Sequence, residues 1–93
     1  MQRKDVLESA IKCVCRDREN EYGRPKENLE SVARYLTEYT RSKYGVQIPY
    51  TGKDVTLIMM FVKIAREATG RGKLDNWVDM AGYAALGAEL MEE

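Results

Sequence analysis

The chain contains no histidine among its 93 residues. This absence excludes imidazole acid–base catalysis and zinc sites with histidine ligands. The longest apolar run extends from Leu57 to Val62, far short of the roughly 20 residues that a membrane-spanning helix needs. The N-terminal residues MQRKDVLESA carry charges where a signal peptide has an apolar segment. We therefore expect a cytoplasmic protein with no membrane partner.

The chain also lacks an excess of charge of either sign, since 15 Lys and Arg residues balance 15 Asp and Glu residues. Domains that bind nucleic acid usually carry a basic excess, so we expect no nucleic-acid partner. Cysteine is scarce, with Cys13 and Cys15 as the two examples. Residues two apart on a helix do not face each other, so a disulfide between them is not expected.

The secondary structure follows from the breaks in the apolar pattern. Glycine and proline interrupt it at residues 23–25, 45–52 and 70–72. Between these breaks apolar residues recur every three or four positions, which predicts helices at roughly 3–22, 26–44, 53–69 and 74–92. Short loops favour antiparallel neighbours. We therefore expect one all-α domain over residues 1–93, an antiparallel bundle of about four helices.

Polar residues interrupt the apolar faces near particular helix ends. In an up-down-up-down bundle, the first and third helices end where the second and fourth begin. This order should bring together Asp17, Arg18, Glu21, Tyr22, Asn28, Lys63, Arg66, Asp75, Asn76 and Asp79. The sequence thus predicts a polar pocket at one end of the bundle.

The acidic residues of this group have two interpretations. Asp75 and Asp79 are one helical turn apart, so both can reach one Mg²⁺ ion, with Glu21 as a further ligand. In the other interpretation Asp75 stabilises the start of the fourth helix, and Asp79 pairs with Lys63 or Arg66. Both remain open at the level of sequence.

The basic residues also have two interpretations. Arg18, Lys63 and Arg66 can form a phosphate site with the N-termini of two helices, which favour anions. Alternatively, Lys63 forms an ordinary i,i+4 pair with Glu67. The remaining candidate ligand contacts are amide groups and aromatic rings that could stack on a base or simply pack in the core: Asn28 and Asn76, and Tyr22 and Trp77.

The fourth predicted helix is rich in small residues. Gly82 and Gly87 lie in its interior, where each glycine costs about 1 kcal/mol relative to alanine. Close packing, inside the bundle or across a dimer interface, would offset this cost. With Met59 and Met60 as further adaptable surface, we expect a homodimer with two-fold symmetry.

Three stretches carry a resemblance to known proteins: residues 22–28 (YGRPKEN), 63–66 (KIAR) and 75–83 (DNWVDMAGY). They resemble a family of small phage and prophage proteins of unassigned function. That family is distantly similar to the all-α nucleotide pyrophosphatases of the MazG and dimeric dUTPase type. The resemblance implies a MazG-like bundle that oligomerises, binds Mg²⁺ through acidic residues on two adjacent helices and cleaves nucleoside triphosphates to monophosphates.

The motif of those enzymes is incomplete in this chain. They carry E-E-x-x-E on one helix and E-x-x-D on the next, whereas residues 76–79 (NWVD) keep the aspartate and not the glutamate. The preceding helix offers Lys63, Arg66 and Glu67 instead of clustered glutamates. Our leading hypothesis is a domain that binds a nucleotide or phosphometabolite, with a divergent Mg²⁺-dependent pyrophosphatase as its enzymatic form. The alternative is a non-catalytic phage interaction or structural protein, whose polar cluster is an internal salt-bridge network.

Overall fold

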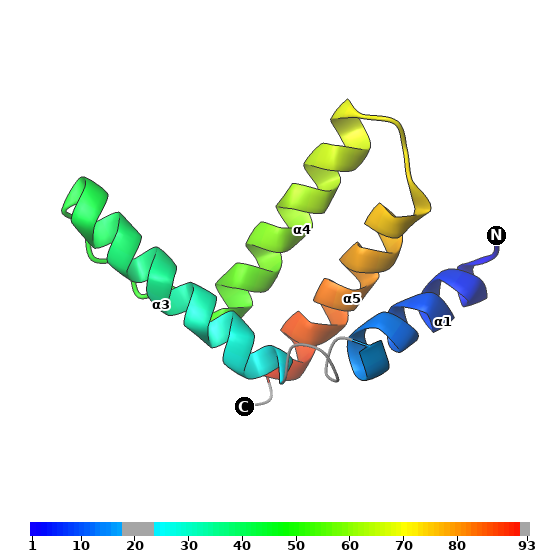
Figure 1. Cartoon of the computed structure of the whole chain (residues 1–93), viewed down its shortest axis with the longest axis horizontal. Coiled ribbons are helices and arrows are strands. Elements are labelled where there is room, and N and C mark those ends of the chain that lie inside the picture. Colours follow the sequence, from blue (N-terminus) through cyan, green and yellow to red (C-terminus); the bar gives the residue numbers. More distant parts are fainter. Residues whose placement is uncertain (18–23, 92–93) are drawn as a thin grey trace.

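The computed structural model describes residues 1–17 and 24–91. Four α-helices lie in these ranges: α1 (Arg3–Lys12), α3 (Pro25–Tyr44), α4 (Gly52–Thr69) and α5 (Leu74–Leu90), with the π-helical turn η1 (Cys13–Asp17) continuing α1. The same ranges contain no strand, so the predicted all-α class is confirmed (Figure 1). Nor does any helix within them have the length and apolar character needed to cross a membrane.

Local sequence signals set the ends of the helices. At the start of α4, the Thr51 hydroxyl accepts a hydrogen bond from the Asp54 amide, and the Asp54 carboxylate accepts one from the Thr51 amide. Such a reciprocal pair satisfies amides that have no partner within the helix. Pro25 occupies the first turn of α3, and Gly45 ends this helix with a left-handed φ of 68°. The predicted boundaries of these two helices agree with the observed ones to within one residue.

The core lies where α3, α4 and α5 meet. Its buried apolar residues are Leu29, Ala33, Val55, Tyr83 and Leu86. The helices α4 and α5 run antiparallel side by side, and α1 packs against the opposite side of α5 (Figure 1). The order across the molecule is therefore α3, α4, α5, α1.

Two glycines allow α5 to approach its neighbours closely. A Cβ atom on Gly82 would lie 2.6 Å from Cγ2 of Val14, and one on Gly87 would lie 2.9 Å from the Thr56 hydroxyl. Both distances are shorter than any ordinary contact, so a larger residue would force the helices apart. Packing within the chain therefore accounts for both glycines, and Met59 and Met60 likewise pack against the core.

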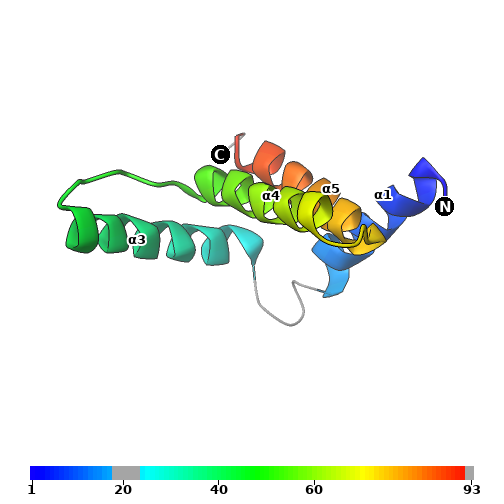
Figure 2. The ribbon, with the colours of Figure 1, turned by 90° about the horizontal axis from the view of Figure 1, so that it is seen from above.

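The connection between α3 and α4 differs from the expected short turn. The segment 46–51 runs back along α3, and the Tyr50 amide donates a hydrogen bond of 3.2 Å to the Thr37 hydroxyl (Figure 2). Gly52 at the start of α4 consequently lies beside Leu29, near the start of α3. The expectation that all successive helices pack antiparallel holds for α4 and α5 but is wrong for α3 and α4. These two helices start together and diverge as a V (Figure 1).

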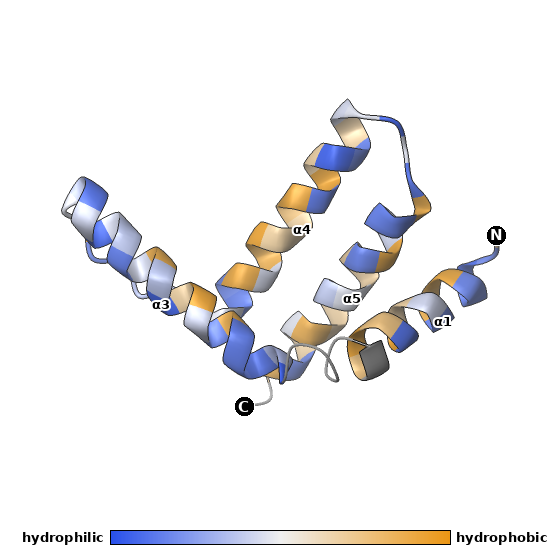
Figure 3. Cartoon of the chain, in the orientation of Figure 1, coloured by the Kyte–Doolittle hydropathy of each residue, from blue (hydrophilic) through white to orange (hydrophobic). Residues whose placement is uncertain are grey.

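The V leaves the molecule open. Its radius of gyration is 14.6 Å, compared with about 12 Å for a compact domain of this length. Apolar residues continue along α4 far beyond its contact with α3 (Figure 3). The single chain therefore covers only part of the apolar surface that its helices carry.

The contact between Gly82 and Val14 generates a testable prediction. Gly82→Ala should lower the free energy of unfolding by about 1 kcal/mol. The added methyl group destabilises the packing by about 1–3 kcal/mol, whereas the higher helix propensity of alanine stabilises the fold by about 1 kcal/mol. In a Val14→Ala background the added methyl group has room, so the same change should raise stability. Urea denaturation of the four proteins measures both effects. A stabilising Gly82→Ala in the native background would contradict the close approach of η1 to α5.

Candidate functional site

A salt bridge joins α4 to α5 in the half of the pair nearest their connecting loop. The Lys63 amino nitrogen lies 2.9 Å from Oδ2 of Asp79, and the two side chains are only 12% and 31% exposed. Partial burial shields this pair from solvent and counterions, so it interacts more strongly than an exposed pair. Of the two interpretations of Asp79, the structure places it in the pairing with Lys63.

Glu67 makes the second link between the same helices. Its Oε1 atom accepts hydrogen bonds from the Asn76 side-chain amide (3.0 Å) and from the backbone amide of Lys73 (3.1 Å). These bonds, chiefly the one from Asn76 and with a smaller one from the Trp77 side chain, hold the pKa of Glu67 below its ordinary value of 4.5. Glu67 therefore connects to α5 and its preceding loop, and not to Lys63 in the i,i+4 pair that was one of the two interpretations of the basic residues.

The predicted site residues on α4 and α5 do share one region. Lys63, Asn76 and Asp79 engage in the contacts described above, whereas Arg66 and Asp75 are exposed to solvent at the adjoining ends of the two helices. The other predicted members, Arg18, Glu21 and Tyr22, lie outside the described residues, as does the side chain of Asp17.

Asn28 does not join this region. It lies in the first turn of α3, next to Leu29, which lies beside Gly52 at the start of α4. Lys63 follows Gly52 by 11 residues, which is about 16 Å along a helix. The prediction that Asn28 lies beside Lys63 is therefore wrong, because segment 46–51 returns the chain to the start of α3. Of the two helix N-termini expected here, only that of α5 is present, so the region favours anions less than expected.

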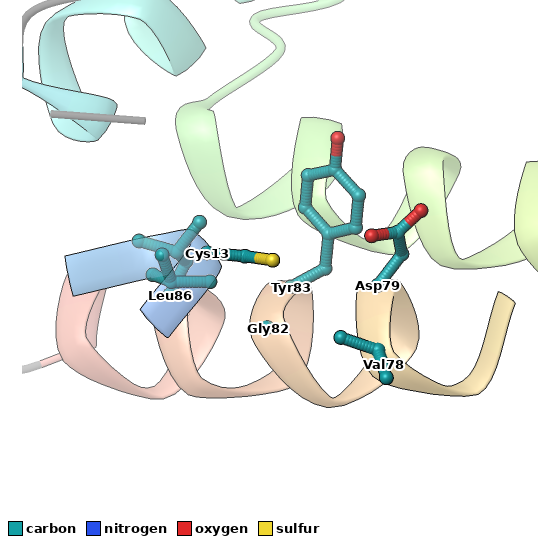
Figure 4. A pocket seen from close by; sticks show the side chains of 7 residues that line it. Cys13, Val78, Asp79, Gly82, Tyr83 and Leu86 are labelled. Carbon is teal, nitrogen blue, oxygen red and sulfur yellow. The ribbon is translucent and has the colours of Figure 1, made fainter. Parts of the chain in front are cut away.

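A small cavity adjoins Asp79 on the side facing η1. Its volume is about 20 Å³, and it is lined by Cys13, Val14, Val78, Asp79, Gly82, Tyr83 and Leu86. The side chains of Asp79 and Tyr83 project side by side from α5 (Figure 4). A space of this size holds one water molecule, whereas sites for nucleotide-sized ligands occupy several hundred Å³.

The charges of the region limit what it can bind. Lys63, Arg66 and Lys73 contribute three positive charges, and Glu67, Asp75 and Asp79 contribute three negative charges. The charges of the region therefore balance, and their sum favours neither a cation nor a free phosphate group. Over residues 1–17 and 24–91, moreover, no three cysteine or acidic side chains gather closely enough to hold a metal ion.

A larger hollow lies at the vertex of the V, where the sequence predicted no site. It has a volume of about 310 Å³ and is lined by Lys26, Glu30, Thr51, Gly52, Lys53 and Leu90. The start of α4 faces this space, but the Thr51–Asp54 capping pair already satisfies an amide there and adds a carboxylate. That arrangement weakens the hollow as an anion site. Its existence depends on the return path of segment 46–51, for which the helical periodicity gives no signal.

The Lys63–Asp79 pair can be tested by removing one partner or both. Lys63→Met should lower the free energy of unfolding by about 1–3 kcal/mol, because it leaves a partly buried carboxylate without its partner. The double variant Lys63→Met/Asp79→Leu should lie within about 1 kcal/mol of the native protein, since an apolar pair of similar volume replaces both charges. Urea denaturation measures each value. Equal losses in the single and double variants would mean that the pair contributes nothing as a pair.

The depressed pKa of Glu67 predicts a dependence of stability on pH. Its hydrogen bonds favour the charged form in the folded state, so they stabilise the fold fully above pH 4.5. This stabilisation is lost as the pH falls below 4.5 and through the lower pKa of the folded state. Glu67→Gln should therefore flatten the decline of stability below pH 4.5, whereas Glu89→Gln on an exposed part of α5 should leave it unchanged. Thermal unfolding between pH 3 and 7 makes the comparison, and parallel curves for the native protein and Glu67→Gln would refute it.

Comparison with known proteins places the chain in a family. Residues 5–91 match a family described as a domain of unknown function (DUF6378). The chain is 33% identical over 89 residues to the Gene 55 protein of Mycobacterium phage D29, covering 95% of this chain and 54% of that protein. It is 36% identical over 81 residues to the Gene 55 protein of Mycobacterium phage L5, covering 87% of this chain and 49% of that protein. The chain thus spans about half the length of these curated relatives, and no solved structure matches it. The chain belongs to the DUF6378 family, with relatives among mycobacteriophage proteins.

Proposed function

We propose that this chain is a non-catalytic assembly domain of a phage protein and that its polar cluster fastens α4 to α5. The observation that carries the proposal is the engagement of Lys63 with Asp79 and of Glu67 with Asn76. A reactive or ligand-binding group needs bonding capacity that faces a ligand. Here the polar groups of the region that are least exposed to solvent form their hydrogen bonds and their salt bridge with one another.

The exposed surface supports the same proposal. Large apolar side chains remain exposed on all four α-helices, and several on α3 and α4 are aromatic. Contiguous exposed apolar patches on a folded domain are typical of surfaces that bind another protein. Aromatic residues are also enriched at the centres of such interfaces.

A second candidate function is Mg²⁺-dependent nucleotide binding, with or without pyrophosphatase activity. One observation favours it: Glu67 on α4 and Asp75 and Asp79 on α5 lie on adjacent antiparallel helices. Pyrophosphatases of the MazG type, which the sequence resembles, bind Mg²⁺ through acidic residues on two adjacent helices. For this function Asp79 would have to bind the metal ion in place of Lys63, so the salt bridge would be lost.

A thermal-shift screen separates the two functions. Nucleoside mono-, di- and triphosphates are tested with and without Mg²⁺, and pyrophosphate release is measured in the same samples. The assembly domain should show no shift, whereas a nucleotide-binding domain gains about 2.7 kcal/mol when the free ligand is a hundred times its Kd. A Mg²⁺-dependent shift with triphosphates would overturn the assembly proposal in favour of the second candidate.

Two variants act as controls for any shift that is observed. Asp79→Asn removes the anionic oxygen while nearly preserving shape, so it should abolish a dependence on Mg²⁺. Lys63→Met should weaken phosphate binding even without metal. A shift that survives both substitutions would arise elsewhere on the protein and would not support a site at this cluster.

A further inference from the structure

A stripe of apolar side chains lies uncovered on α4. Leu57, Phe61 and Ile64 follow one another at intervals of four and three residues, so they share one face of the helix. Each is between 45% and 65% exposed. The residues that pack against the core or α5, such as Met59 and Lys63, lie on a different face. The α4 stripe is therefore additional to the surface that the fold itself buries.

A matching stripe lies on α3, the other arm of the V. Val32, Tyr35 and Tyr39 follow at intervals of three and four residues and are between 42% and 72% exposed. Tyr44 extends this stripe, because its ring lies 6.4 Å from that of Tyr39 in an edge-to-face arrangement. The buried face of α3 carries Leu29 and Ala33 instead. Each arm thus has one face in the core and one apolar face that residues 1–17 and 24–91 leave exposed.

We propose that these two stripes form a two-fold interface between two copies of this chain. This inference rests on the assembly function proposed above and names its partner. The area of the stripes supports it. An aromatic side chain buries about 150–250 Å² when fully covered, so the exposed parts of the two stripes sum to on the order of 700 Å². A standard protein interface buries about 800 Å² on each partner, so the two areas are comparable.

Charge and geometry favour a second copy over a partner of opposite charge. The chain has no net charge, so two copies do not repel one another at long range. On α3 the exposed Glu38 and Arg41 pair with each other on a different face of the helix, so this pair places no charge on the stripe. Because the arms diverge, an arm of one copy can pack on an arm of the other and replace the contact that the open V lacks. The sequence predicted an interface formed by Met59, Met60 and the small residues of α5. Both methionines and both glycines already pack inside the chain, so the interface lies on α3 and α4 instead.

Sedimentation equilibrium of the native protein, of variants on the α4 stripe and of a control variant away from both stripes tests the proposal. The native protein should sediment as a dimer at tens of micromolar, and Leu57→Glu or Phe61→Glu should raise its dissociation constant at least thirtyfold. Leu7→Glu is the control, because Leu7 on α1 is exposed to a similar degree (57%) but lies on neither stripe. A monomeric native protein, or equal dissociation with Leu7→Glu, would overturn the proposal. Circular dichroism establishes that each variant is folded.

Hydrogen exchange tests the interface in the native protein, without a substitution that could itself disturb the fold. Between 1 and 100 µM protein, amides of residues 32–39 and 57–64 should become more protected with concentration, while those of α1 should not. Protection independent of concentration would refute the interface. A monomer with no nucleotide shift rejects only the second copy as partner and leaves an assembly function with another protein. A dimer with a Mg²⁺-dependent nucleotide shift rejects the assembly function and retains the interface.

Discussion

The close contact between α4 and α5 organises the other elements of this protein. Thr56 is buried against Gly87 in one half of the pair, and in the other half Lys63 and Glu67 reach across to Asp79 and Asn76. The glycine brings the two backbones close, and the polar contacts fix which residues face each other. With α5 held in this way, its opposite side, at Gly82, is free to receive η1. The polar contacts between α4 and α5 therefore stabilise the packing of these two helices.

The second constraint is the path of segment 46–51. Had the chain turned sharply after Gly45, α4 would have packed along the whole of α3 and the two helices would have covered each other's apolar faces. Instead the segment occupies one side of α3, held by the bond from Tyr50 to Thr37, and α4 starts beside Leu29. The path of this loop therefore has two consequences. The polar residue at the start of α3 lies far from those at the end of α4, and apolar stripes on α3 and α4 remain exposed.

These constraints explain why the functional proposal favours assembly. A site for a phosphorylated ligand needs convergent groups with free bonding capacity, and the fold separates Asn28 from Lys63 while using Asp79 and Glu67 for packing. A site for another protein needs apolar surface on rigid elements, and α3 and α4 supply it. The same helices cannot readily satisfy both needs, because the salt bridge that rigidifies α4 against α5 would have to open before a metal ion could bind Asp79.

The sequence by itself determined the helices, the breaks between them and the pairing partners available to Asp79. These features depend on periodicity, glycine and proline positions and i,i+3 capping, all of which act within a few residues of the chain. It also correctly indicated that Gly82 and Gly87 require close packing. Only the tertiary structure decided that Lys63 bonds Asp79 rather than Glu67, that both glycines pack inside the chain, and that Asn28 lies about eleven residues of helix away from Lys63. The reason is that helix periodicity specifies which face is apolar but not which neighbour covers it, and a seven-residue loop can either turn back at once or run the length of a helix before the next one begins.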